Sequence, residues 1–293
     1  PLRTSSGKVR AVARMPVLAM LHPFTQLGWL AWSIHPSTVI GLAVLVAIYL
    51  WRASKATPEE TVAGPRKLSF FAALFVIFAS LNGPLHDLSD DYLFSAHMVQ
   101  HLLLTLAMPP LLIAGIPGWM LRPLLRNRAA GAIARRITKP IVCFSIFNIV
   151  IAAWHVPALY NLAMANHNVH IVEHLMFMAA AVLMWWPLMS PLPELPRLAY
   201  PGQMLYCFLM SVPMSIVAVY ITMADQVLYP AYASAPRISP LSPMDDQMLG
   251  GLIMWVPGGL IFALIMTVVF FKWAARGEDS TAGAQVDWKP RAA

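Results

Sequence analysis

Charged side chains are scarce in this sequence. Asp, Glu, Lys and Arg make up 11% of its 293 residues, whereas hydrophobic residues make up 59%. So little charge cannot cover the surface of a water-soluble domain of this size. The basic residues form no run interleaved with aromatic side chains, which excludes a nucleic-acid surface, and the alternating pattern of an outer-membrane barrel is also missing. The composition therefore predicts an all-α, polytopic membrane protein.

Cysteine is nearly absent as well. Cys143 and Cys207 are the only two, and each lies inside an apolar stretch. A disulfide framework is therefore not expected, and no CxxC or CxxxC pair is present to bind a metal through thiolates. Any metal chemistry in this chain has to use other side chains.

Seven apolar runs each predict a membrane-spanning helix, which needs roughly 20 apolar residues. They cover residues 37–51, 68–84, 95–117, 140–158, 168–189, 201–223 and 248–273. The connections are short, so we predict one transmembrane domain over residues 35–275. Residues 1–34 form a basic N-terminal segment whose apolar part, 15–33, is expected to be interfacial or re-entrant, with an eighth span as the alternative. Residues 276–293 are predicted to be a flexible polar tail.

Basic residues are concentrated in alternate loops, which predicts the orientation. Lys and Arg are frequent in the first and third loops and in the C-terminal tail, whereas loops 85–94 and 159–167 contain none. The basic face is therefore predicted to be cytoplasmic. The opposite face carries Asp87, Asp90 and Asp91, and its negative field would attract cations.

Histidine has a one-sided distribution along these predicted helices. Eight of the nine lie at the non-cytoplasmic helix ends or in the adjoining loops, namely His35, His86, His97, His101, His155, His167, His170 and His174. Only His22 is outside this set. Imidazole is costly in lipid and is the commonest side-chain ligand of transition metals. The distribution therefore indicates a metal or cofactor site at that membrane surface.

Two histidine pairs stand out within this set. His97 and His101 open the third predicted span, and His170 and His174 open the fifth. Residues four apart lie on one helix face, about 6 Å apart, where two imidazoles can bind one metal ion. Each pair follows a span that ends near another histidine, which indicates a weak internal repeat. We predict that six histidines converge as metal ligands: His97, His101, His170, His174, His155 and His86.

Copper is the metal that the available donors favour, with zinc as the alternative. Imidazole binds copper, zinc, iron and nickel, and thioether adds a preference for Cu(I). Five methionines lie near the histidine face: Met98, Met164, Met223, Met244 and Met248. Only neutral imidazole binds a metal, so affinity is expected to fall below about pH 6.

Three other functions use the same residues. The segment from His170 to His174 fits the HxxEH pattern of inverted zinc proteases, with Glu173 as general base. Histidines from facing helices also hold haem in electron-transfer proteins. A copper permease would need further polar positions toward the cytoplasm, and the inner halves of the spans offer few.

Four segments resemble the membrane-embedded CtaG family of caa3-type cytochrome c oxidase assembly factors. They are residues 97–117 (HMVQHLLLTLAMPPLLIAGIP), 148–160 (NIVIAAWHVPALY), 170–187 (HIVEHLMFMAAAVLMWWP) and 246–259 (DQMLGGLIMWVPGG). The likeness extends over roughly residues 33–273. His97, His101, His155, His170 and His174 occupy the family's motif positions, and His86 is a further candidate.

The resemblance implies a multi-pass protein of the bacterial inner membrane that is needed to make a haem-copper oxidase, through its copper supply. Its expected partners are a periplasmic copper donor, the lipid bilayer and the oxidase subunit that carries a histidine copper centre. We expect the protein to be a binding factor and not an enzyme. The single-span, cysteine-bearing copper chaperones of similar name work differently, because this chain has no cysteine on its histidine face.

Overall fold

The computed structural model describes the backbone of residues 33–286 and the side chains of residues 33–276. Its elements are α2 (Pro36–Ser54), α3 (Gly64–Leu81), α4 (Pro84–Asp91), α5 (Phe94–Leu102), the π-helical turn η2 (Leu103–Ala107), α6 (Met108–Gly115), α7 (Gly118–Arg126), α8 (Arg128–Ile137), α9 (Pro140–His155), α10 (Pro157–Ala165), α11 (His167–Met189), α12 (Tyr200–Thr222), α13 (Pro230–Ser234) and α14 (Pro243–Val286). Residues 33–286 contain no strand, and the predicted all-α class is confirmed. His22 and all but the last residue of the predicted interfacial stretch lie outside the described residues.

Within residues 33–286, six helical stretches are long and apolar enough to cross a membrane. They are Pro36–Ser54, Gly64–Leu81, Phe94–Gly115, His167–Met189, Tyr200–Thr222 and Pro243–Arg276. The predicted span 140–158 corresponds to α9, which has 16 residues and so extends about 24 Å, less than the roughly 30 Å of a bilayer core. It qualifies as a seventh span together with α8, from which it is bent by 73°.

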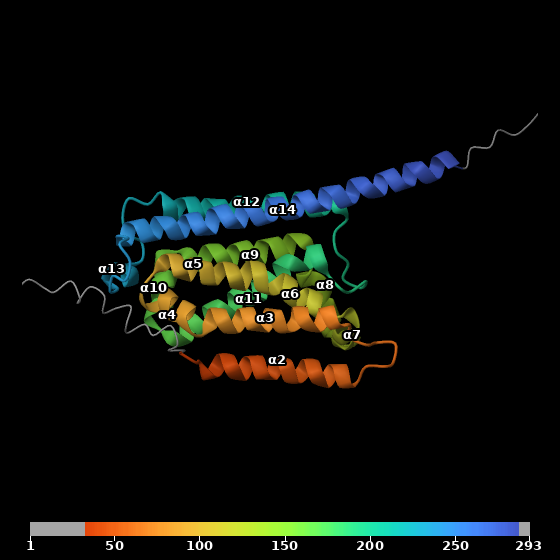
Figure 1. Ribbon diagram of the computed structural model, residues 1–293, viewed down its shortest axis with the longest axis horizontal. Coiled ribbons are helices and arrows are strands. Elements are labelled where there is room, and N and C mark those ends of the chain that lie inside the picture. The colour runs from red at the N-terminus through yellow and green to blue at the C-terminus, as the bar shows by residue number, and fades with distance from the viewer. Residues whose placement is uncertain (1–32, 287–293) are drawn as a thin grey trace, which may run out of the picture.

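The long helices run side by side, with the short helices gathered at the two ends (Figure 1). α4, α10 and α13 lie at one end, and α7 and α8 lie at the other. α12 packs along α14, α3 packs on α6, and α11 packs on α9. α2 lies at the edge and buries only Tyr49, while side chains such as Ile40 and Ile48 point outward. Apolar side chains on the outer surface are expected where lipid, not water, is the solvent.

The third span is broken by its own sequence. Pro109 has no N–H, so the carbonyl of Thr105, four residues earlier, loses its helical partner. The indole Nε1 of Trp185 on α11 donates to that carbonyl over 2.9 Å. The Thr105 hydroxyl donates to the carbonyl of His101 over 2.6 Å, and the backbone widens to the π-helical turn η2. The break directly follows the first histidine pair and is held by the helix that carries the second.

Two glycines are needed where α3 meets its neighbours. Gly83 has a φ of 73°, the left-handed region, which allows the chain to leave α3 and start α4. A Cβ at Gly115 would lie 2.5 Å from the backbone nitrogen of Phe70, so glycine allows α6 to approach α3 closely. The first of these positions sets the direction of α4, which carries His86 and Asp90.

Candidate metal centre

The two predicted histidine pairs meet inside the bundle. The ring centroids within each pair are 4.2 Å apart for His97 and His101 and 4.4 Å apart for His170 and His174. Between the helices, His97 lies 5.6 Å from His170, and His101 lies 5.5 Å from His174. All four side chains are buried. Two helix faces, each with i, i+4 histidines, therefore face each other as the sequence predicted.

The other predicted histidines extend this cluster in two directions. His155, the last residue of α9, lies 5.9 Å from His101, and His86 on α4 lies 6.2 Å from His170. Beyond His86 follow His35, at 4.5 Å, and then the exposed His167, at 5.8 Å from His35. All eight described histidines thus form one row of rings, from the surface to the interior.

Two carboxylates belong to the cluster although sequence reasoning gave them other roles. Among the described residues, the donor atoms of Asp90, His97 and His170 lie within 4.8 Å of one another, and so do those of His97, His101 and Glu173. Glu173 is fully buried. Asp90 had been assigned to an acidic loop, but it lies four residues after His86 on α4, a spacing that brings the two side chains together.

Hydrogen bonds fix which ring nitrogen of two histidines is free. The Tyr232 hydroxyl donates to the carbonyl of Ser89 over 2.7 Å and lies 3.2 Å from Nδ1 of His97. Burial raises the pKa of Tyr232, so its hydroxyl keeps its proton. When that proton is donated to Ser89, Nδ1 of His97 is the donor to the Tyr232 oxygen. Nδ1 of His155 donates to the carbonyl of Ile151 over 2.7 Å. In both rings Nε2 is buried and has no hydrogen-bond partner within the described chain.

Asp90 connects two more histidines with different consequences. Its Oδ2 lies 3.3 Å from Nδ1 of His170 and 3.4 Å from Nε2 of His86. Burial raises the pKa of Asp90, but the hydrogen bond from His170 and the nearby imidazoles outweigh burial and hold that pKa well below its usual range. His170 therefore keeps Nε2 free. Nδ1 of His86 lies 3.1 Å from the Gln100 amide, which also donates to the carbonyl of Ser80, so both ring nitrogens of His86 have protein partners.

The remaining donor atoms of the cluster fit a metal ion. Within the part of the chain that the structure describes, the following buried atoms have no hydrogen-bond partner: Nε2 of His97, His155 and His170, both ring nitrogens of His101 and His174, and both carboxyl oxygens of Glu173. Polar groups buried in this way are costly unless hydrogen-bonded or bound to a metal. The donor set is imidazole and carboxylate, which suits copper or zinc.

An aspartate on the last helix holds α5 in place. Asp246 of α14 is fully buried and accepts hydrogen bonds from the backbone nitrogens of Phe94 (2.7 Å) and Ser95 (3.2 Å) and from the Ser95 hydroxyl. It caps the start of α5 from a distant part of the chain, as an N-cap residue does locally. The helix that carries His97 and His101 is thereby fixed to α14.

Comparison with known families agrees with this arrangement. A family model described as "Cytochrome c oxidase caa3 assembly factor (Caa3_CtaG)" matches residues 44–276. The chain belongs to the Caa3_CtaG family. The match includes both histidine pairs, both carboxylates and Asp246. Comparisons with curated proteins and with solved structures gave no match. The predicted resemblance is confirmed, and membership of the Caa3_CtaG family associates this chain with assembly of the caa3 oxidase.

The histidine cluster of this Caa3_CtaG protein has buried apolar side chains of α11 on one side and a groove on another. The ring of Phe177 lies 4.4 Å from His101 and 6.0 Å from His155, and Ala181 and Met184 on the following turns of α11 are also buried. A mostly apolar groove of about 640 Å³ lies between α2 and helices α3, α6 and α11. Its histidine lining is His86, His167, His170 and His174. The cluster therefore has apolar side chains toward the basic end of the bundle and adjoins the groove on the side of α2.

The orienting role of Asp90 leads to a first prediction. Asp90→Asn is expected to weaken metal binding by about 10–100-fold, because the loss of a carboxylate that orients a ligating imidazole has that effect in other metal sites. Metal titration of the purified variant measures this. Asp91→Asn is the matched control, since Asp91 is the neighbouring carboxylate and is exposed. Equal affinities of the two variants would refute the role of Asp90.

Proposed function

We propose that this Caa3_CtaG protein binds a copper ion in its buried histidine cluster and supplies it during assembly of the oxidase, without catalysing a reaction. The observation that carries the proposal is the set of buried imidazole and carboxylate atoms without hydrogen-bond partners. Each polar atom that is buried without a hydrogen-bond partner destabilises the fold, so selection for stability alone would replace the residues that carry such atoms.

The proposed ligands are the rings with a free Nε2. These are His97, His101, His155, His170 and His174, with Glu173 as the carboxylate donor. The two three-residue groups share His97, whose Nδ1 is already held by Tyr232. One Nε2 binds one ion at a time, so we expect one ion per chain. His86, whose two ring nitrogens are already engaged, is proposed to position Asp90.

Copper is preferred over zinc because a haem-copper oxidase is the destination that the family membership supplies. Thiolates do not compete for the ion. Cys143 donates to the carbonyl of Ile137 near the start of α9, at the end opposite to His155, and Cys207 is buried in the packed core. Both are free cysteines.

Delivery is proposed to occur at the periplasmic edge of the membrane. The distribution of Lys and Arg supports this orientation, because the loops at the opposite end are basic. Asp87, Asp90 and Asp91 would attract the cation from a periplasmic donor. The groove beside His170 and His174 supports a lateral approach of the oxidase subunit through the membrane.

Metal analysis of the purified protein tests the proposal. We expect about one copper per chain at pH 7, bound through the unprotonated imidazoles. The visible spectrum should lack a Soret band. A Soret band would indicate haem instead, and zinc with proteolysis that Glu173→Gln abolishes would indicate the metalloprotease. Purified protein that holds no copper and takes up none on titration would refute the proposal.

A further inference from the structure

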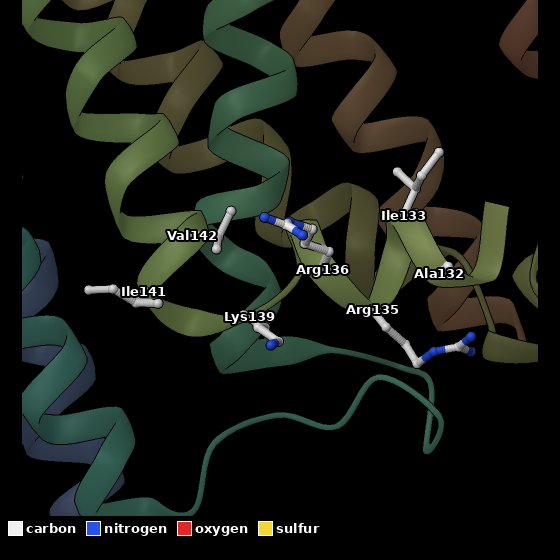
Figure 2. A pocket seen from close by; sticks show the side chains of 7 residues that line it. All are labelled: Ala132, Ile133, Arg135, Arg136, Lys139, Ile141 and Val142. Atoms are coloured by element: carbon white, nitrogen blue, oxygen red, sulfur yellow. The ribbon is translucent and has the colours of Figure 1, made fainter. Parts of the chain in front are cut away.

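A second hollow lies at the end of the bundle opposite to the histidines. It has a volume of about 740 Å³ and lies between α8 and the start of α9. Figure 2 shows its lining side chains, which are Ala132, Ile133, Arg135, Arg136, Lys139, Ile141 and Val142. The hollow plays no part in the proposed copper site, so its chemistry has to be explained separately.

The charge of this hollow is positive and uncompensated. In the described part of the chain, no carboxylate lies within ion-pair distance of Arg135, Arg136 or Lys139. By contrast, Arg122 at the same end pairs with Glu194 at 3.0 Å. Lys139 is also the N-cap of α9, a 16-residue helix whose N-terminus carries a partial positive charge. The hollow is thus suited to an anion.

The apolar side chains that line the hollow favour a lipid over a soluble anion as its ligand. Ile133 is 60% exposed and Ile141 is 69% exposed, so both present hydrocarbon outward beside the cations. α8 is bent by 73° from α9 and so leaves the direction of the spanning helices at this border. Basic side chains next to exposed apolar side chains match the two parts of a phospholipid, its phosphate headgroup and its acyl chain.

The three cations lie differently in Figure 2. The guanidinium of Arg136 extends toward Val142 of α9 and Lys139 lies between α8 and α9, whereas Arg135 extends the other way along α8. A Cβ at Gly131 would lie 3.4 Å from the Arg135 guanidinium, which is consistent with that direction. We propose that the hollow binds one anionic phospholipid, with its phosphate between Arg136 and Lys139 and an acyl chain along Ile141 and Val142.

Lipid binding by the full chain tests this site. Native mass spectrometry with phosphatidylglycerol and phosphatidylcholine is expected to show retention of phosphatidylglycerol. Arg136→Gln/Lys139→Gln should weaken that retention about 30-fold, because each basic residue contributes about 1 kcal/mol toward an anionic lipid. The matched control is Lys55→Gln/Arg128→Gln, which removes the same charge from exposed positions outside the hollow. The control is expected to retain the lipid.

Two further measurements keep the proposal falsifiable. Arg136→Lys/Lys139→Arg keeps the charge and is expected to bind normally, which shows whether a loss comes from charge or from misfolding. Glycerol phosphate, which has the anion but no acyl chain, should compete poorly. Equal loss in the glutamine variant and its control, or efficient competition by glycerol phosphate, would overturn the proposed site. Copper content is a separate readout, so failure of this proposal leaves the copper proposal intact.

Discussion

The variant His101→Leu/His174→Leu is expected to lose nearly all bound copper, with affinity weakened at least about 100-fold, since even the loss of a residue that only orients a ligand weakens metal sites by about 10–100-fold. Both ring nitrogens of each residue lack a hydrogen-bond partner within the described chain, and the rings lie 5.5 Å apart on facing helices. Leucine fills a similar volume without donor atoms. Copper per chain, measured after purification, gives the result.

The same variant also tests whether the loss of copper binding occurs without a loss of folding stability. Replacing buried, unpaired polar groups by apolar ones of similar size is often neutral or stabilising, so the metal-free variant should melt at the same temperature as the metal-free native protein or higher. The control is His35→Leu/His167→Leu, which removes two imidazoles from the outer part of the row. If both variants kept one copper, or lost it equally, the buried cluster would not be the binding site.

Asp246→Ala is expected to lower the free energy of unfolding by about 3 kcal/mol or more, because three buried donors of Phe94 and Ser95 lose their acceptor and each such loss costs about 1–3 kcal/mol. α5 would no longer be fixed to α14, so copper affinity should fall together with stability. Thermal or denaturant unfolding in detergent, with copper titration on the same sample, measures both effects.

Asp245→Ala is the matched control for this change. Asp245 is the preceding residue, is exposed, and bonds only locally to Ser242 in the first turn of α14. It is expected to change stability by less than about 1 kcal/mol, as exposed caps usually do. A similar loss in both variants would mean that Asp246 acts as an ordinary helix cap and not as the anchor of the histidine helix.

Much of the fold could be predicted from the sequence because lipid imposes simple rules. Apolar runs gave all six spanning stretches to within a few residues. α9 was harder, because its length of 16 residues is decided by the bend at Lys139 and Pro140, which hydropathy does not register. The i, i+4 spacing of the two histidine pairs predicted a shared face on each helix, and the internal repeat indicated that these faces meet.

The rest of the site depends on tertiary contacts that spacing does not encode. That Gln100 engages His86, and that Tyr232 engages His97, follows only once α4, α5 and α13 are packed together. The same holds for the contact of Asp246 with the start of α5, which joins distant parts of the chain. Glu173 had a sequence signal in HxxEH, but the pattern alone could not distinguish a ligand from a general base.

The apolar side chains around Phe177 have an energetic consequence for the proposed copper ion. Phe177, Ala181 and Met184 are buried on α11 between the histidines and the basic end of the bundle, so an ion held by His101 would be expected to enter and leave at the histidine end. Moving one elementary charge across a full membrane costs or releases about 2.3 kcal/mol per 100 mV. Cargo that returns to its side of origin has no net displacement across that voltage. The full cycle of loading and delivery would therefore neither use the membrane voltage nor work against it.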